Sequence, residues 1–156
     1  MKVSENFSLT ELTYSDTAVR RGIKNEPTDE ILRNLQKVCQ FILEPLRNHF
    51  GNPVVITSGF RSPELCLAVG STIKSSHTRG EAVDMEIFGI ANREVAEWVV
   101  RNLDFDQVIL EFYEEGIPNS GWVHVSYCEG SNRKQYLKAY RKNGLIVYEG
   151  MTLVSK

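Results

Sequence analysis

The strongest hydrophobic pattern in the chain lies between residues 28 and 50 and predicts a long α-helix. Apolar side chains recur there at intervals of three and four residues, which places them on one helix face: Ile31, Leu32, Leu35, Val38, Cys39, Ile42, Leu43 and Leu46. Asp29 and Glu30 fall in the first turn, where the helix dipole favours negative charge. Because Pro45 lacks an amide hydrogen, we expect the helix to bend or restart there and to stop at Gly51.

Shorter patterns predict strands and two further helices. Strands are expected at residues 53–58, 81–88, 105–112 and 122–127, which alternate in polarity or are rich in β-branched side chains. Ser62 as N-cap and Pro63 as first helical residue begin a short helix that Gly70 terminates. Asn92 is expected to cap the other helix. Its core-facing positions are Val95, Ala96, Val99 and Leu103.

The two ends of the chain carry weaker signals. Residues 1–27 form a polar N-terminal segment with irregular apolar anchors, in which Ser8 or Thr10 caps a single helical turn. The anchors are Phe7, Leu9, Leu12 and Ile23. A C-terminal hairpin at about residues 134–150 is expected around Asn143-Gly144, because Asn-Gly between two strand-like runs favours a tight hairpin turn.

Together these elements predict one α+β domain over residues 1–156, with an antiparallel β-sheet and helices packed mainly on one of its faces. The 42% of apolar side chains suffice for one core. A formal net charge of −2 provides no basic surface for nucleic acid or anionic lipid. The three cysteines, at positions 39, 66 and 128, are expected to be free thiols, mostly buried. Neither a signal segment nor a membrane span is expected.

Two predicted strands and one loop place three metal-ligand side chains together. Asp84 alternates with the apolar residues of its strand, and His124 does the same, so both project from the face opposite the core if the strands pair. The loop 71–80 delivers His77 beside them. Two nitrogens and one oxygen with an open position match a catalytic zinc site. His49, near a helix end, is expected to be an ordinary surface residue.

The motif S-x-H-x-x-G-x-A-x-D at residues 75–84, followed by W-x-H at 122–124, resembles the zinc signature of peptidase family M15. Residues 57–63 resemble the SGYR-type turn of that family, and residues 6–12 resemble the N-terminal segment of a phage-associated subgroup. The resemblance implies the hedgehog/DD-peptidase fold and the activity of a D-Ala-D-Ala carboxypeptidase or an L-alanyl-D-glutamate endopeptidase. It also implies a zinc ion on His77, Asp84 and His124.

The same resemblance implies roles for residues around the metal. Arg61 is expected to hold a substrate carboxylate or the developing oxyanion, the alternative being a solvated turn cation. Ser75 either orients the His77 loop or a substrate carbonyl, or simply caps the loop. Trp122 is either a wall of the substrate cleft or a packing residue on an edge strand.

The general base departs from the family pattern. Many M15 members place an acidic residue three positions before the last zinc histidine, where this chain has Gly121. Glu111, at the end of the strand before His124, is the best replacement, with a surface carboxylate as the alternative. Glu114 and Glu115 are further candidates.

We therefore expect zinc-dependent hydrolysis of a peptide bond in bacterial peptidoglycan stem peptides by a monomeric, phage-derived enzyme. The protein would be made in the cytoplasm without a signal peptide and would reach the cell wall by phage-type release or within a virion. The main alternative is a zinc-containing module that binds the wall or a partner without turnover, such as a phage structural component, and Gly121 favours it. A metal-free structural domain is the second alternative.

Overall fold

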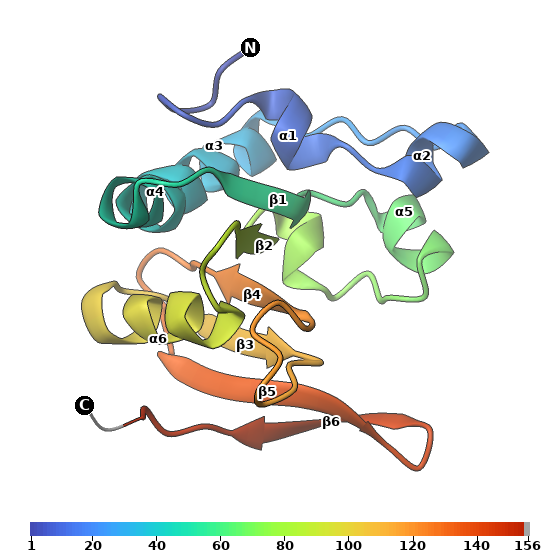
Figure 1. Ribbon diagram of the computed structural model, residues 1–156. Helices are drawn as coiled ribbons and strands as arrows, with labels where there is room; N and C mark the ends of the chain where they lie inside the picture. The colour runs from blue at the N-terminus through green and yellow to red at the C-terminus, as the bar shows by residue number, and fades with distance from the viewer. Residues whose placement is uncertain (155–156) are drawn as a thin grey trace.

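The computed structural model describes residues 1–154, which are organised around one six-stranded sheet of order β1-β2-β4-β3-β5-β6 (Figure 1). The strands are β1 (Val54–Ser58), β2 (Ala82–Ile87), β3 (Gln107–Glu111), β4 (Trp122–Ser126), β5 (Gln135–Lys142) and β6 (Leu145–Gly150). The expected strands are therefore present, each trimmed by one or two residues at its ends.

The expectation of an antiparallel sheet is wrong for one pair of strands. Strands β3 and β5 pair in parallel, whereas the other four neighbouring pairs are antiparallel. The reason lies in the loop after β4: because β4 is antiparallel to β3, it ends beside the start of β3, and the loop then carries the chain to the other edge of β3. Gln135 donates a backbone hydrogen bond to Asp106 there, so β5 starts beside the start of β3 and runs in the same direction.

The helices are α1 (Leu9–Thr13), α2 (Asp16–Arg21), α3 (Asp29–Val38), α4 (Glu44–Phe50), α5 (Pro63–Ala68) and α6 (Asn92–Asn102). A π-helical segment, η1 (Cys39–Leu43), joins α3 to α4, and a 3₁₀ turn, η2 (Ser76–Arg79), lies in the loop before β2. The predicted interruption near Pro45 is confirmed as this wide π turn, which ends just before the proline. Gly51 ends the helix with a φ of 72°.

Helix caps agree with the sequence at two sites and differ at one. Ser8 caps α1 in a capping box with Glu11, and Ser62 accepts a hydrogen bond from the Leu65 amide at the start of α5. The prediction that Asn92 caps α6 is wrong, because Asn92 is the first helical residue and its amide group donates instead to the Ser120 carbonyl. Helix α2 was not expected from the sequence.

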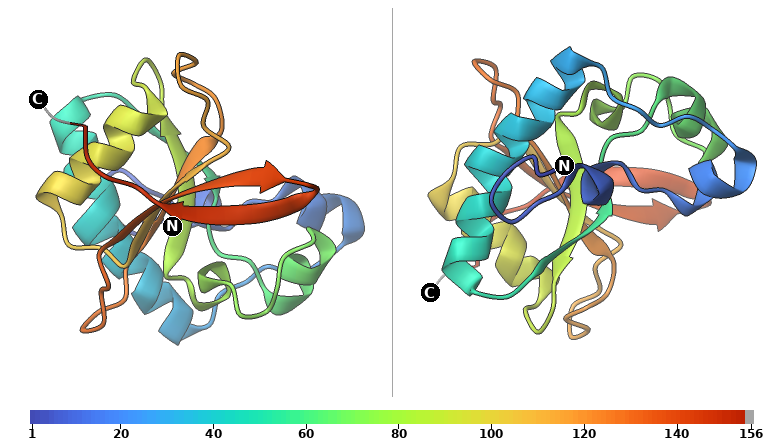
Figure 2. Two further views of the ribbon diagram at one scale, coloured as in Figure 1. Left: turned by 90° about the horizontal axis from the view of Figure 1, so that it is seen from below. Right: turned by 90° about the horizontal axis from the view of Figure 1, so that it is seen from above.

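The two faces of the sheet are covered differently (Figure 2). The α3–α4 helix and α6 pack on one face, where their apolar stripes meet the inward side chains of the strands. The core on this side includes Leu35, Val38, Ile42, Leu43, Val83, Met85, Ile87, Val95, Val99, Val108, Leu110, Val123 and Val125. Helix α5 and turn η2 lie on the other face, near β1 and β2. Most helical residues thus cover one face, as the patterns indicated.

The C-terminal hairpin and the cysteines match their predictions. Asn143 and Gly144 have φ values of 51° and 78°, and these left-handed residues form the two-residue turn between β5 and β6. Cys39, Cys66 and Cys128 are free thiols, and the first two are buried. None of the helices within residues 1–154 is long and apolar enough to span a membrane.

Candidate metal centre

Strand register brings Asp84 and His124 together on the face of the sheet opposite the main core. The two residues are direct cross-strand partners in the antiparallel β2–β4 pair. Their neighbours Val83 and Val123 point into the apolar core, so strict alternation turns Asp84 and His124 the other way. The predicted phase of both strands is therefore correct.

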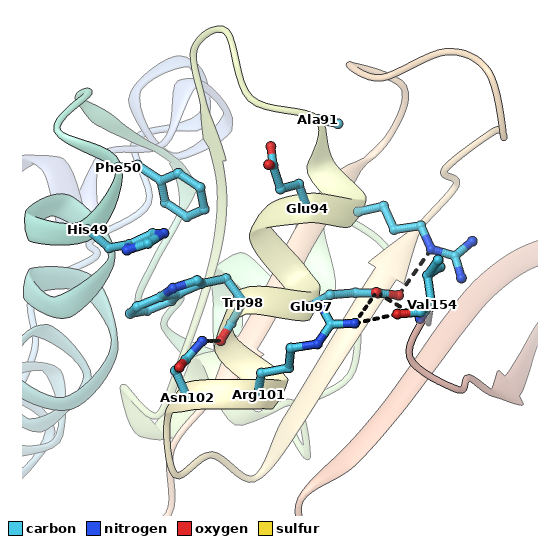
Figure 3. Close-up of a pocket in the computed structure, with 10 residues that line it drawn as sticks. His49, Phe50, Ala91, Glu94, Glu97, Trp98, Arg101, Asn102 and Val154 are labelled. Carbon is cyan, nitrogen blue, oxygen red and sulfur yellow. Dashed lines mark hydrogen bonds and ion pairs between the residues drawn. The ribbon is translucent and has the colours of Figure 1, made fainter. Parts of the chain in front are cut away.

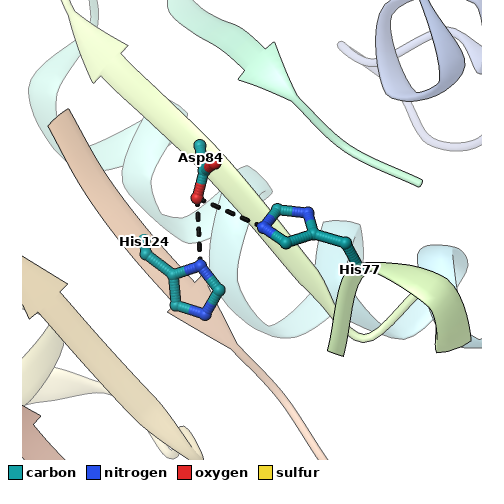
Figure 4. A group of neighbouring side chains, drawn as sticks. All are labelled: His77, Asp84 and His124. Atoms are coloured by element: carbon teal, nitrogen blue, oxygen red, sulfur yellow. Dashed lines mark hydrogen bonds and ion pairs between the residues drawn. The ribbon is translucent and has the colours of Figure 1, made fainter. Parts of the chain in front are cut away.

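His77 reaches the same point from turn η2 (Figure 4). The hydroxyl of Ser75 caps this turn by accepting a hydrogen bond from the His77 amide. The His77 Nδ1 atom lies 2.7 Å from the carbonyl oxygen of Gly59. A carbonyl can only accept, so Nδ1 carries the proton and Nε2 keeps its lone pair for a metal.

The three side chains have the spacing of a tetrahedral metal site. His77 Nε2 lies 3.4 Å from Asp84 Oδ1, and His124 Nδ1 lies 3.0 Å from the same oxygen. All three ligand atoms lie within 4.8 Å of one another. Tetrahedral ligands at about 2.0–2.2 Å from one zinc ion are about 3.3–3.6 Å apart, so the pairs at 3.4 Å and 3.0 Å are close to that spacing. The donor set and its geometry therefore fit zinc.

Charge within the group is balanced by its neighbours. Burial opposes the charged form of Asp84, but His77 and the hydrogen bond with His124 outweigh burial and lower the pKa of Asp84. Burial likewise opposes the charged form of His124, and the hydrogen bond with Asp84 raises its pKa. The second carboxylate oxygen of Asp84 lies 3.4 Å from the Arg61 guanidinium. Asp84 is thus held ionised, as a metal ligand must be.

Glu111 lies on the face of the sheet that carries Asp84 and His124, here called the metal face, two residue pairs along from His124. It is the cross-strand partner of Trp122, and Ile109 is the partner of His124. The Trp122 indole N–H donates a 2.5 Å hydrogen bond to Glu111 Oε2. Burial and the nearby charge of Asp84 raise the pKa of Glu111, although the Trp122 hydrogen bond acts in the opposite sense. A half-buried carboxylate with a raised pKa is suited to proton transfer.

His77, Asp84 and His124, here called the metal group, and the neighbouring carboxylate of Glu111 occur in a chain whose residues 5–126 match the family model for Peptidase M15. The chain belongs to the peptidase M15 family. M15 membership makes it a metallopeptidase by descent, and the His-Asp-His group supplies a possible metal site. Comparison with curated proteins gave no match.

The structure explains why this M15 chain has glycine at the usual base position. Gly121 has a φ of 60°, and a Cβ atom built on it would lie 1.9 Å from the Glu111 carbonyl oxygen. A side chain therefore cannot be accommodated at residue 121 with the present backbone. The close packing that excludes a base there also fixes the end of β3, which carries Glu111.

The other sequence candidates are placed as follows. Trp122 is not on an edge strand, since β4 lies between β2 and β3, so that alternative is wrong. Its contact with Glu111 was not anticipated, and no sequence signal points to it. Glu115 pairs with Arg93 of α6, Glu114 is exposed, and within the described residues neither belongs to the metal group of this M15 domain. His49 is exposed on α4 and stacks on Trp98.

Two pockets of the M15 domain are separate from the metal group. A pocket of about 450 Å³ lies between the end of α4 and α6 (Figure 3). Its walls include His49, Phe50 and Trp98, and Glu97 on its floor is already bonded to Arg93 and Tyr136. A second pocket, of about 350 Å³, includes Lys138 and Glu149. Neither is lined by a residue of the metal group.

Proposed function

We propose that the protein is a zinc-dependent peptidase that hydrolyses a peptide bond in the stem peptides of bacterial peptidoglycan. Its action would be that of an L-Ala–D-Glu endopeptidase or a D-Ala-D-Ala carboxypeptidase, on a hedgehog/DD-peptidase-like fold. One observation carries the proposal: His77 Nε2, Asp84 Oδ1 and His124 Nδ1 converge beside Glu111 in an M15 chain. Three protein ligands leave the fourth position of a tetrahedral zinc open for chemistry.

His77, Asp84 and His124 would hold the ion. When bound, zinc supplies a Lewis acid that polarises a carbonyl and lowers the pKa of water toward neutrality. The hydrogen bond from His77 to Gly59 orients the imidazole before the metal arrives. The Arg61 contact fixes Asp84 so that Oδ1 faces the two histidines.

Glu111 is proposed as the general base. Its Oε2 atom accepts the Trp122 hydrogen bond, which leaves Oε1 to take a proton from the attacking water and return it to the leaving amine. The raised pKa of Glu111 lies closer to neutral pH than that of an ordinary carboxyl group, which suits a group that must both accept and return a proton. Trp122 holds this carboxylate in place and forms part of the cleft wall.

Arg61 is proposed to bind the substrate carboxylate or the developing oxyanion. Its Nε donates to Ser58 and one terminal nitrogen contacts Asp84, so the guanidinium is fixed at the metal with other N–H groups to spare. Ser75 acts through its cap on η2, which sets the position of His77.

The resemblance of residues 6–12 to a phage-associated subgroup supports a phage-derived wall hydrolase. We propose peptidoglycan, or a peptide containing D-amino acids, as its partner and a monomer as its working form. Delivery would follow host lysis or virion attachment.

The deciding experiment is to incubate zinc-loaded protein with purified peptidoglycan and to measure new amino termini and released D-Ala. New L-Ala–D-Glu breaks or free D-Ala support the proposal and identify the bond. Zinc-loaded protein that binds the wall and releases neither product establishes the binding-module alternative instead. Equal, near-zero zinc in the wild type and in His77→Ala would show that the domain holds no metal.

A further inference from the structure

The β5–β6 hairpin lies beyond the family match, which ends at residue 126, yet it extends the metal face of the sheet. Glu111 is the register partner of Ala139, and Ala139 is the partner of Tyr148. Partners in register point to the same face, so Tyr148 stands on the same face as Glu111 with only a methyl group between them. Figure 2 shows the hairpin projecting away from α6 on the side where α2 and α5 lie.

The Tyr148 side chain is exposed to solvent and also interacts electrostatically with Glu111. Tyr148 is 54% exposed. Partial burial and the negative charge of Glu111 raise the pKa of the Tyr148 phenol, which places the ring within electrostatic reach of the proposed base. A half-exposed phenol at this position offers both an apolar surface and a hydrogen-bonding group to a ligand.

Arg141 stands next along β5 on the same face, two residues from Ala139. Its guanidinium lies over the ring of Phe112, 5.7 Å from the ring centroid. Phe112 has a φ of 58°, an unusual value for a residue with a side chain. This left-handed turn brings Phe112 against Trp122, with ring centroids 5.4 Å apart, so the aromatic pair joins Arg141 to the Glu111 site.

Arg141 has no ion-pair partner within residues 1–154. Lys138, on the other face of the same strand, pairs with Glu149, whereas no carboxylate within residues 1–154 forms an ion pair with Arg141. An arginine held on an aromatic ring keeps its planar donors directed to the edge, where a carboxylate can bind. The guanidinium of Arg141 is therefore available to an anionic ligand.

We propose that Arg141 and Tyr148 form a remote substrate subsite that binds a free carboxylate of the peptide about four residues from the scissile bond. Two to three strand spacings of about 4.8 Å across the sheet, together with an offset of two to four residues along the strands, separate His124 from Tyr148 and Arg141, which gives roughly 16 Å between their backbones. An extended peptide covers about 3.3–3.6 Å per residue, so four to five residues span this distance. The inference rests on the proposed peptidase function and adds to it a preference for acidic peptides.

The test uses zinc-loaded protein and the stem pentapeptide L-Ala–γ-D-Glu–L-Lys–D-Ala–D-Ala, together with its D-Glu α-carboxamide and its C-terminal carboxamide. Arg141→Gln should lower kcat/KM for the acid roughly five- to tenfold through KM, with kcat unchanged. The same substitution should have no effect on one of the two amides, and that amide identifies the carboxylate. Arg141→Lys should retain part of the preference.

Lys142→Gln is the matched control, because Lys142 is exposed and adjacent but points to the other face. It should behave as wild type. Hydrolysis in which Arg141→Gln leaves kcat/KM of all three peptides unchanged overturns the subsite and leaves the peptidase function standing. If no peptide is hydrolysed, calorimetric binding of the same peptides decides: acid binding that weakens in Arg141→Gln supports the subsite and overturns only the enzyme, whereas absent or unaltered binding overturns both.

Discussion

The two faces of strand β2 are both buried, but for opposite reasons. Val83 and Met85 pack against the helices, and burial of such side chains stabilises the fold by removing apolar surface from water. Asp84, between them in the sequence, is 5% exposed on the other face, where burial of a carboxylate costs free energy. The fold retains Asp84 only because His77, His124 and Arg61 surround it. One face of the strand thus supports stability, and the other supports chemistry.

The largest effect should come from removing a ligand on the metal face. His77→Ala is expected to reduce bound zinc and peptide hydrolysis to near zero, because only two ligands remain. Metal analysis and a peptidoglycan assay measure both quantities. His49 is the histidine outside the metal group, so His49→Ala should leave zinc content and peptide hydrolysis unchanged. A His77→Ala protein with full zinc content would refute the ligand assignment.

Loss of the proposed base should separate metal binding from turnover. Glu111→Gln is expected to keep zinc and to lower kcat by about 10²–10⁴-fold, the usual contribution of a general base. Glu115→Gln is the control, since that carboxylate pairs with Arg93 away from the metal. Full activity in Glu111→Gln would move the base to another residue.

The opposite face should respond in stability rather than in chemistry. Met85→Ala removes a fully buried side chain from the core and should lower the free energy of unfolding by about 2–5 kcal/mol. Urea unfolding measures this loss. The variant that remains folded should bind zinc with wild-type stoichiometry, and a selective loss of zinc from folded protein would show that the two faces are not independent.

A smaller loss of stability is expected at Gly121. Gly121→Ala places a side chain in the left-handed region and against the Glu111 carbonyl, so unfolding should become easier by at least about 1–2 kcal/mol. Because the clash lies at the end of β3, activity should also fall in the folded protein. Gly121→Glu should not restore a Glu111→Gln enzyme, and restoration would mean that the loop can rearrange to the common M15 arrangement.

The smallest effect should be a shift in pH dependence. Burial and the charge of Asp84 raise the pKa of Glu111 above 4.5, so kcat/KM should fall as the pH decreases through a value above 4.5 and protonates the base. Trp122→Phe removes a hydrogen bond that favours the carboxylate and should move this acidic limb to higher pH. A pH profile of both proteins checks the direction, and a shift to lower pH would contradict the role of Trp122.

Short-range patterns in the sequence determined much of this protein. The spacing of apolar residues predicted the helix at 28–50, and alternation predicted which faces of β2 and β4 carry Asp84 and His124. These features depend on neighbours within a few residues, because helix and strand periods are fixed by backbone geometry. The motif around His77 and Asp84 indicated the family, which the family model then showed.

Only the tertiary structure decided how distant segments meet. The bond from His77 to Gly59, the bond from Trp122 to Glu111 and the row from Glu111 to Tyr148 depend on strand order and register. Strand β5 pairs in parallel with β3 because β4 ends beside the start of β3 and the loop after β4 crosses to the other edge of β3, and nothing in the alternation of β5 reveals its partner. The sequence determined the ligands, whereas the packing of the loops and strands determined what surrounds them.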